Sequence, residues 1–394
     1  MQARVLVSVF ANFLTGAITG LLGGLVMALL DYLSQLAWGQ QVLRGFPSQA
    51  PVVWQFLLPL ITGLAIGLLR RAGAQPLPEL HVTLAQLRQT NEQQQSLDLS
   101  FRGSHLLLGL LALVGGGSLG PEAMLSRMLA EINLNLKRVQ QSISPKINLI
   151  KSRWSWLAAL LGGIAGFALT QGFNRFGGGE QGVAFIWPQS PSQAGLNLLW
   201  ALVLGLLGGC LGLLFLGLRQ QLSKQWKRFS VSTLNQALFA GLVLALVNIW
   251  QPLALFSGEQ QLSPLLQGAL MQGPGALLLL GLLKIGLCAL CLESGWVGGL
   301  FFPLIIGAAA IASGLHQALG IIPNEVAVSA LVASIQAAIL AQPLVPLFVT
   351  LAVLKGHALP AALLGSLVGW QLGKQGKKQQ LSPDPTRVSK DELL

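Results

Sequence analysis

A short segment containing glycine and proline carries the residue types best suited to binding a small ligand. Residues 115–122 read Gly-Gly-Gly-Ser-Leu-Gly-Pro-Glu and lie between two apolar runs, at residues 106–114 and 123–129. Consecutive glycines disfavour a helix because glycine loses the most backbone freedom on folding. Proline suits the first helical turn, where its missing N–H is not needed. We therefore predict an extended, glycine-rich approach to a helix that begins near Pro121.

The start of that helix is predicted to be an anion site built from the backbone. The first N–H groups of a helix have no partner within the helix, and the helix dipole adds positive charge at that end. Irregular backbone at membrane depth is tolerated only where it is buried in protein or lines a cavity. A helix that begins inside a membrane therefore offers its first N–H groups to an anion.

A second segment repeats the pattern in the other half of the chain. Residues 298–303 read Gly-Gly-Leu-Phe-Phe-Pro, and Pro303 is the fourth residue after Gly299, as Pro121 is the fourth after Gly117. Paired glycine- and proline-interrupted apolar segments are typical of transport proteins with inverted repeats, which bind their substrate at these breaks. The two segments are thus predicted to build one site.

The composition identifies the elements that must position these segments. Of 394 residues, 53% are hydrophobic and only 9% are charged, whereas a soluble domain carries about 25% charged residues. A membrane span needs roughly 20 apolar residues, and several apolar blocks are too long or too broken for one straight helix. We predict an all-α polytopic membrane protein with more helices than blocks. The blocks lie near residues 5–30, 52–69, 105–129, 155–170, 195–218, 235–256, 265–292, 296–319, 327–354 and 358–372.

The chain is expected to form one transmembrane domain over residues 1–379. Its first repeat is placed at about 1–190 and its second at 191–379, followed by a disordered polar tail at 380–394. The formal net charge of +11 is assigned to cytoplasmic loops, where Lys and Arg accumulate in membrane proteins, and not to nucleic-acid binding. Both termini are then cytoplasmic.

These motifs resemble those of the ClC chloride channel and transporter family over most of the chain. The family's Gly-x-x-Gly-Pro motif is matched by residues 117–121, and its Ser-Gly-x-x-Gly-Gly-x-Phe-x-Pro motif by residues 294–303. Lys284 matches a basic residue that often precedes the second motif. The resemblance implies a homodimer with one anion pathway per subunit, and two inverted repeats of broken, tilted helices. It further implies a divergent, prokaryotic-type member in a bacterial plasma membrane, without regulatory domains or cofactors.

The resemblance also assigns anion-binding positions. Backbone N–H groups of Leu300 and Phe301 would face a central anion site. Those of Ser118, Leu119, Gly120 and Phe302 would face an outer one. Backbone dipoles would replace part of the hydration shell of chloride or another small anion, and the binding must stay weak enough for release. No catalytic residue set or metal ligand cluster is recognised in the sequence, and we expect a transport protein, not an enzyme.

Four side chains of the family pattern have no match in this sequence. The family's gating glutamate corresponds to Leu119, which cannot ionise or mimic a chloride ion. The family's central serine corresponds to Gly73. The only tyrosine, Tyr32, lies far from the family's tyrosine near the end of the membrane domain, and residues 155–180 offer no match for its inner proton-relay glutamate.

Three charged residues are candidates for accessory roles. Glu122 follows Pro121, but successive helical side chains differ by about 100° in direction, so it does not replace a side chain at 119; it suits a helix start as an acidic residue. Glu293 adjoins the second motif and is either a site residue or a loop residue facing water. Lys284 is expected near the pathway or paired, because a charge facing lipid is costly.

Three functions follow from these residues. Passive chloride conduction without proton coupling is the leading hypothesis, because Leu119 replaces the ionisable gate. Proton-coupled exchange that uses Glu122 or Glu293 is the first alternative. A membrane scaffold or regulator that no longer transports is the second, since the central serine and the tyrosine are both missing.

Overall fold

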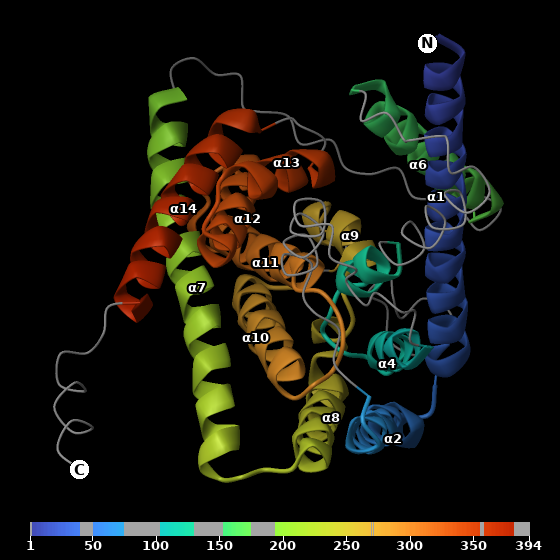
Figure 1. The fold of residues 1–394 in the computed structure, drawn as a ribbon. Helices are drawn as coiled ribbons and strands as arrows, with labels where there is room; N and C mark the ends of the chain where they lie inside the picture. The colour runs from blue at the N-terminus through green and yellow to red at the C-terminus, as the bar shows by residue number, and fades with distance from the viewer. Residues whose placement is uncertain are drawn as a thin grey trace, which may run out of the picture. The chain divides into compact units, whose positions relative to one another are not determined.

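The computed structural model describes residues 2–39, 50–74, 103–129, 153–174, 194–268, 270, 272–354 and 358–381 (Figure 1). Within these ranges there is no strand, only an isolated antiparallel bridge between Gly120 and Gly299. The prediction of an all-α chain is confirmed. The α-helices are α1 (Gln2–Trp38), α2 (Val52–Arg71), α4 (Gly103–Val114), α6 (Arg153–Asn174), α7 (Ala194–Arg228), α8 (Thr233–Trp250), α9 (Leu262–Leu266), α10 (Pro274–Glu293), α11 (Phe301–Leu319), α12 (Asn324–Leu340), α13 (Leu344–Val353) and α14 (Leu359–Leu381), with a further short helix at 122–129 and the 3-10 turns η4 (Pro252–Ala254) and η5 (Glu259–Gln261).

Six of the described helices are long and apolar enough to cross a membrane. They are Val9–Trp38 of α1 and the whole of α2, α7, α8, α10 and α11. The described α-helices also outnumber the apolar blocks of the sequence, as expected from blocks that contain breaks. The block at 327–354, for example, is split into α12 and α13 where Ala341 adopts a left-handed conformation, with φ of 53°, ahead of Pro343.

The chain divides into two compact units that interleave in sequence. Unit one comprises Met1–Gln181, Ser232–Ser257 and Ser294–Leu300, and unit two comprises Gly182–Val231, Gly258–Glu293 and Phe301–Leu394. The boundary predicted between two repeats, near residue 190, lies outside the described residues, as does the polar tail from residue 382. The repeats therefore remain a prediction.

In unit one, α1 lies along α6 through a seam of glycines (Figure 1). A side chain at Gly16 or Gly20 of α1 would collide with the backbone carbonyl of Ala159 or Gly163 of α6. Small residues let membrane helices approach until their backbones touch, so that van der Waals contact replaces the missing hydrophobic driving force. The second pair in this unit, α2 and α8, also packs closely.

In unit two, α12 is the buried centre. Every residue from Val326 to Ile339 is buried, and α12 packs against α7, α11 and α14. Gly365 and Gly369 of α14 lie against the carbonyl groups of Ala330 and Ser334. An apolar helix without a polar face is stable only when it is enclosed in this way.

We predict that Gly20→Ala destabilises the protein while Gly163→Ala does not. A methyl group at 20 would meet the carbonyl of Gly163, whereas one at 163 would lie 3.7 Å from the nearest atom, an ordinary contact. Both changes raise helix propensity equally, so the difference in stability between the two variants reports the packing of the helices. Overpacking at such a contact costs about 1–3 kcal/mol. Thermal unfolding of the purified variants in one detergent measures it, and equal unfolding temperatures would contradict the seam.

Candidate functional site

The two glycine–proline motifs meet in unit one through a pair of backbone hydrogen bonds. The N–H of Gly120 donates to the carbonyl oxygen of Gly299 at 2.8 Å, and the N–H of Gly299 donates to the carbonyl oxygen of Gly120 at 2.6 Å. This antiparallel bridge brings together two segments that the sequence analysis paired only by their similarity.

The bridge requires glycine at two positions because the loops approach so closely. A Cβ atom on Gly298 would lie 2.5 Å from the Cβ atom of Leu119, and one on Gly299 would collide with the carboxyl group of Glu122. The Leu119 side chain is completely buried. Leu119 thus packs against the second motif, and the carboxyl end of Glu122 lies beside the bridge itself.

The glycine run before the bridge has a role that the sequence analysis did not foresee. Gly116 has a left-handed φ of +89°. Its N–H donates to the carbonyl oxygen of Leu113, and the N–H of Gly117 donates to the carbonyl oxygen of Ala112 at 2.9 Å. These two bonds form a Schellman motif, which closes the C-terminal end of a helix. The run therefore caps α4 and turns the chain, in place of the simple extended approach that was predicted.

The helix starts agree with the first motif and differ slightly at the second. The helix at 122–129 follows Pro121 directly, and the N–H of Leu125 donates to the Pro121 carbonyl oxygen at 2.9 Å. In contrast, α11 begins at Phe301, and Pro303 is its third residue. The first N–H groups of a helix have no intrahelical acceptor, so proline at the third position removes no hydrogen bond.

The N–H groups assigned to anion binding differ in whether they already donate a hydrogen bond within the protein. The Leu119 N–H donates to the carbonyl oxygen of Gly117 at 2.8 Å, and the Gly120 N–H is used in the bridge. Within the described residues, no acceptor is found for the N–H groups of Ser118 and Leu300. Both residues are buried. Of these four N–H groups, those of Ser118 and Leu300 are thus the two without an acceptor among the described residues.

Two buried hydroxyl groups lie in the same loops. The Oγ atoms of Ser118 and Ser294 have no hydrogen-bond partner among the described residues, and both side chains are completely buried. A buried hydroxyl without a partner loses about 1–3 kcal/mol of solvation. Such a group marks a place where water or an anion completes the hydrogen bonding.

Side chains from the helices of unit one fix the second loop. The Arg70 guanidinium donates to the carbonyl oxygen of Ser294 at 3.1 Å, and the Trp296 indole N–H donates to the carbonyl oxygen of Ala237 at 3.1 Å. Neither partner was identified from the sequence, because Arg70 is distant in the chain and resembles an ordinary basic residue at a helix end. No local pattern marks such a long-range contact.

Gly73, the position of the family's central serine, is found at the end of α2. Its φ is +97°. Its N–H donates to the carbonyl oxygen of Arg70, and the N–H of Ala74 donates to the carbonyl oxygen of Leu69. This is again a Schellman motif, and Gly73 is exposed. A helix-capping role accounts for this glycine, and its assignment to an anion site stays a prediction.

The remaining charged candidates lie in unit two. Lys284 is completely buried in α10, with its Nζ atom 3.0 Å from where a Cβ on Gly258 would be. Glu293, the last residue of α10, accepts a hydrogen bond from Arg219 of α7 at 2.7 Å. Glu293 is therefore an ion-paired carboxylate, and its partner was not predicted from the sequence.

A sequence profile described as "Voltage gated chloride channel" matches residues 149–372, more than half of the chain. The chain belongs to this voltage gated chloride channel family. The match includes the second motif and Lys284, whereas the first motif precedes it. The resemblance to ClC proteins is confirmed, and the protein is an integral, multi-pass membrane protein of an anion-transport family.

Solved structures share the fold at low sequence identity. A structure titled as a CLC-type fluoride/proton antiporter has a TM-score of 0.66 and 19% identity, with 93% of this chain and 95% of that chain covered. The structure of a slow cyanobacterial Cl⁻/H⁺ antiporter has a TM-score of 0.60 and 17% identity, with 96% of this chain and 99% of that chain covered. The structure of a eukaryotic CLC transporter has a TM-score of 0.69 and 14% identity, with 95% of this chain and 73% of that chain covered. No curated protein sequence matches the chain.

We predict that Gly298→Ala separates the two loops. The added methyl group would meet the Cβ atom of Leu119, which cannot move without its backbone, and overpacking of this kind costs about 1–3 kcal/mol. Gly286→Ala is the matched control, because nothing lies within 4 Å of a Cβ atom there. Thermal unfolding of both purified variants tests the bridge, and an unchanged Gly298→Ala protein would show that the loops are not in contact.

Proposed function

We propose that this protein conducts chloride or a similar small anion passively, without coupling to protons. The observation that carries the proposal is Leu119, a side chain that cannot ionise, buried where the two motif loops meet. A carboxylate at this place could exchange a proton for each anion that it admits. Leucine leaves no group at 119 to carry a proton.

The proposed anion contacts are the donors that remain unused at the loops. They are the N–H groups of Ser118 and Leu300 and the hydroxyl groups of Ser118 and Ser294. The N–H groups of Phe301 and Phe302, at the start of α11, were assigned to anion binding by the resemblance alone, and the proposed contacts of unit one do not depend on them. Neutral donors hold an anion weakly enough to release it again, as conduction requires. The proposed unit is a homodimer with one pathway per subunit.

One observation favours the alternative of proton-coupled exchange. The carboxyl group of Glu122 lies next to Gly120 and Gly299, so an ionisable group is present beside the bridge, although not at position 119. Two of the similar structures are titled as proton antiporters. Glu293 is a weaker candidate for this role, because it is paired with Arg219.

A flux measurement in proteoliposomes separates these functions. We expect an outward chloride gradient to drive chloride efflux without uphill proton movement, in the parent and in Glu122→Gln alike. Proton pumping in the parent that disappears in Glu122→Gln would replace conduction by exchange through Glu122. Absence of anion flux from well-folded, reconstituted protein would instead favour the scaffold role.

We expect Leu119→Glu to introduce a gate that closes as pH rises. The ionised carboxylate would be held by the donors of the anion site, and protonation would release it, so that efflux increases several-fold as pH falls. Efflux is compared between about pH 7.5 and pH 4.5, around the ordinary titration of glutamate. Leu119→Gln is the matched control, with the same shape and no titration, and should respond like the parent. Equal pH responses of the glutamate and glutamine variants would place residue 119 outside the pathway.

A further inference from the structure

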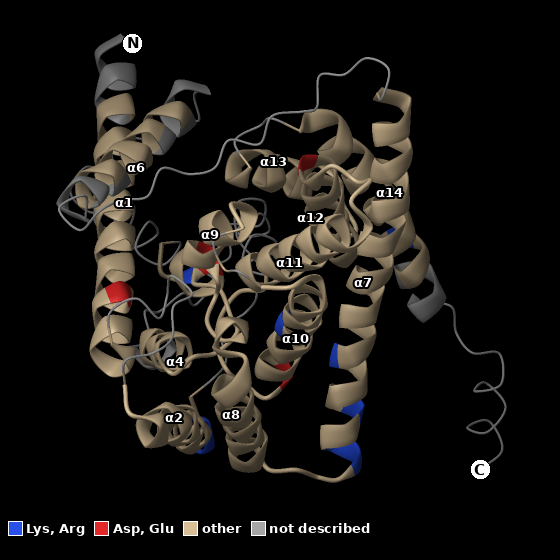
Figure 2. Ribbon diagram, turned by 180° about the vertical axis from the view of Figure 1, so that it is seen from behind, with Lys and Arg blue, Asp and Glu red and all other residues tan. Residues whose placement is uncertain are grey.

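The C-terminal end of α7 extends beyond the length that a membrane requires. The helix has 35 residues, which corresponds to about 52 Å, whereas the hydrocarbon core is about 30 Å thick. Basic residues gather on the end that leads toward α8 (Figure 2). They include Arg219, Lys224, Lys227 and Arg228. A polybasic helix end of this kind is expected at the level of lipid headgroups.

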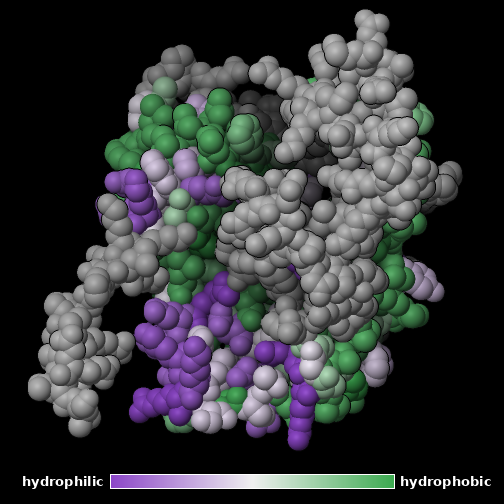
Figure 3. All heavy atoms as spheres, viewed as in Figure 1, coloured by the Kyte–Doolittle hydropathy of each residue, from purple (hydrophilic) through white to green (hydrophobic). Residues whose placement is uncertain are grey.

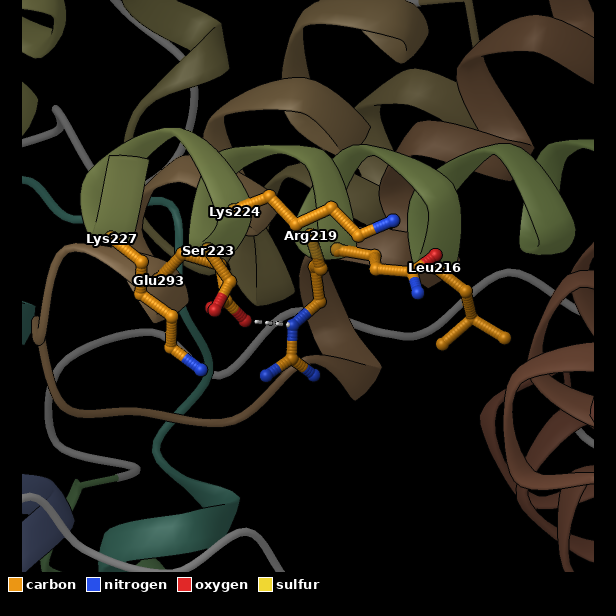
Figure 4. Close-up of a pocket in the computed structure, with 7 residues that line it drawn as sticks. Leu216, Arg219, Ser223, Lys224, Lys227 and Glu293 are labelled. Carbon is orange, nitrogen blue, oxygen red and sulfur yellow. Dashed lines mark hydrogen bonds and ion pairs between the residues drawn. The ribbon is translucent and has the colours of Figure 1, made fainter. Parts of the chain in front are cut away.

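A cleft lies along this end of α7, within unit two. Its volume is about 390 Å³, and its polar lining comes from Arg219, Gln220, Ser223, Lys224 and Lys227 of α7, together with Glu293 of α10 (Figure 4). Positions 220, 223 and 227 recur at helical spacing, so one face of α7 supplies most of the wall. We call it the α7 basic cleft.

An ion pair fixes the guanidinium in the wall of this cleft. The Nε atom of Arg219 is 2.7 Å from Glu293, and the two side chains are only 22% and 18% exposed. Figure 4 shows them directed toward one another below α7. With Lys224 and Lys227 also lining the cleft, three cations and one carboxylate leave a formal charge of +2. The anion transport proposed above uses none of these groups.

We propose that the α7 basic cleft binds the phosphate group of an anionic phospholipid. Arg and Lys side chains bind phosphate through charge-assisted hydrogen bonds, and Gln220 and Ser223 add neutral hydrogen-bonding groups. The surface over this end of α7 is hydrophilic in Figure 3. Leu216, one turn before Gln220 on the same face of α7, adds an apolar side chain to the lining on the side of the apolar span. A ligand with a phosphate headgroup and acyl chains matches this succession better than a soluble phosphate does.

Lipid retention by the full-length protein tests the proposal without any transport measurement. The parent, purified in a neutral detergent, is titrated with phosphatidylglycerol or with phosphatidylcholine, and bound lipid is counted by native mass spectrometry. We expect selective retention of phosphatidylglycerol. Since each Lys or Arg near an anionic headgroup contributes about fivefold in affinity, Lys224→Gln/Lys227→Gln should bind phosphatidylglycerol about 25-fold more weakly.

Two further variants serve as controls. One removes positive charge outside the cleft, and the other removes the negative charge within it. Arg228→Gln/Lys374→Gln removes the same charge from exposed positions of unit two outside the cleft and should lose clearly less affinity than Lys224→Gln/Lys227→Gln. Glu293→Gln removes the carboxylate that competes for Arg219 and should strengthen binding several-fold. Equal losses in both double variants would reduce the effect to general surface attraction and overturn the site, as would an unchanged Lys224→Gln/Lys227→Gln variant.

Free phosphate and pyrophosphate form the last arm of the experiment. The lipid proposal expects neither to displace bound phosphatidylglycerol at millimolar concentration. If pyrophosphate raises the unfolding temperature of the parent but not of Lys224→Gln/Lys227→Gln, and phosphatidylglycerol is not retained, the cleft binds phosphate from a soluble source and the lipid assignment is overturned.

Discussion

The candidate site depends on one close backbone contact, the bridge between Gly120 and Gly299. Its two hydrogen bonds form only if neither loop carries a side chain at the point of contact, so the glycines at 298 and 299 are steric requirements. The rest of unit one holds the loops in place for it: α4 is capped by Gly116 just before the first loop, and Arg70 holds the second.

The bridge also changes which groups a ligand can meet. Forming it consumes the N–H of Gly120, and the turn before it consumes that of Leu119. A helix start is therefore only a general indication of an anion site, because the local hydrogen bonding decides which donors remain. Here the two hydroxyl groups without a partner among the described residues, at Ser118 and Ser294, lie in the loops, while Gly73, which the resemblance matched to the family's serine, closes a helix.

Local signals in the sequence predicted more of this structure than long-range ones. Apolar length and glycine–proline breaks predicted the all-α class, more helices than apolar blocks, and the helix start after Pro121, whereas the position of the split between α12 and α13 was not predicted. The ion pair between Arg219 and Glu293, and the contact of Arg70 with Ser294, were not predictable, because each joins residues that are distant in the sequence. Pro303 was placed at the helix start, yet it lies inside the first turn, since either position costs no hydrogen bond.

A site built from main-chain amides is largely indifferent to the side chains around it. Substitutions in the loops leave the N–H donors in place so long as the glycines at the contact persist and no proline removes a donor, whereas the hydroxyl groups of Ser118 and Ser294 would be lost. Alanine scanning would therefore understate the contribution of these loops, because most substitutions change a side chain and leave the donor N–H in place.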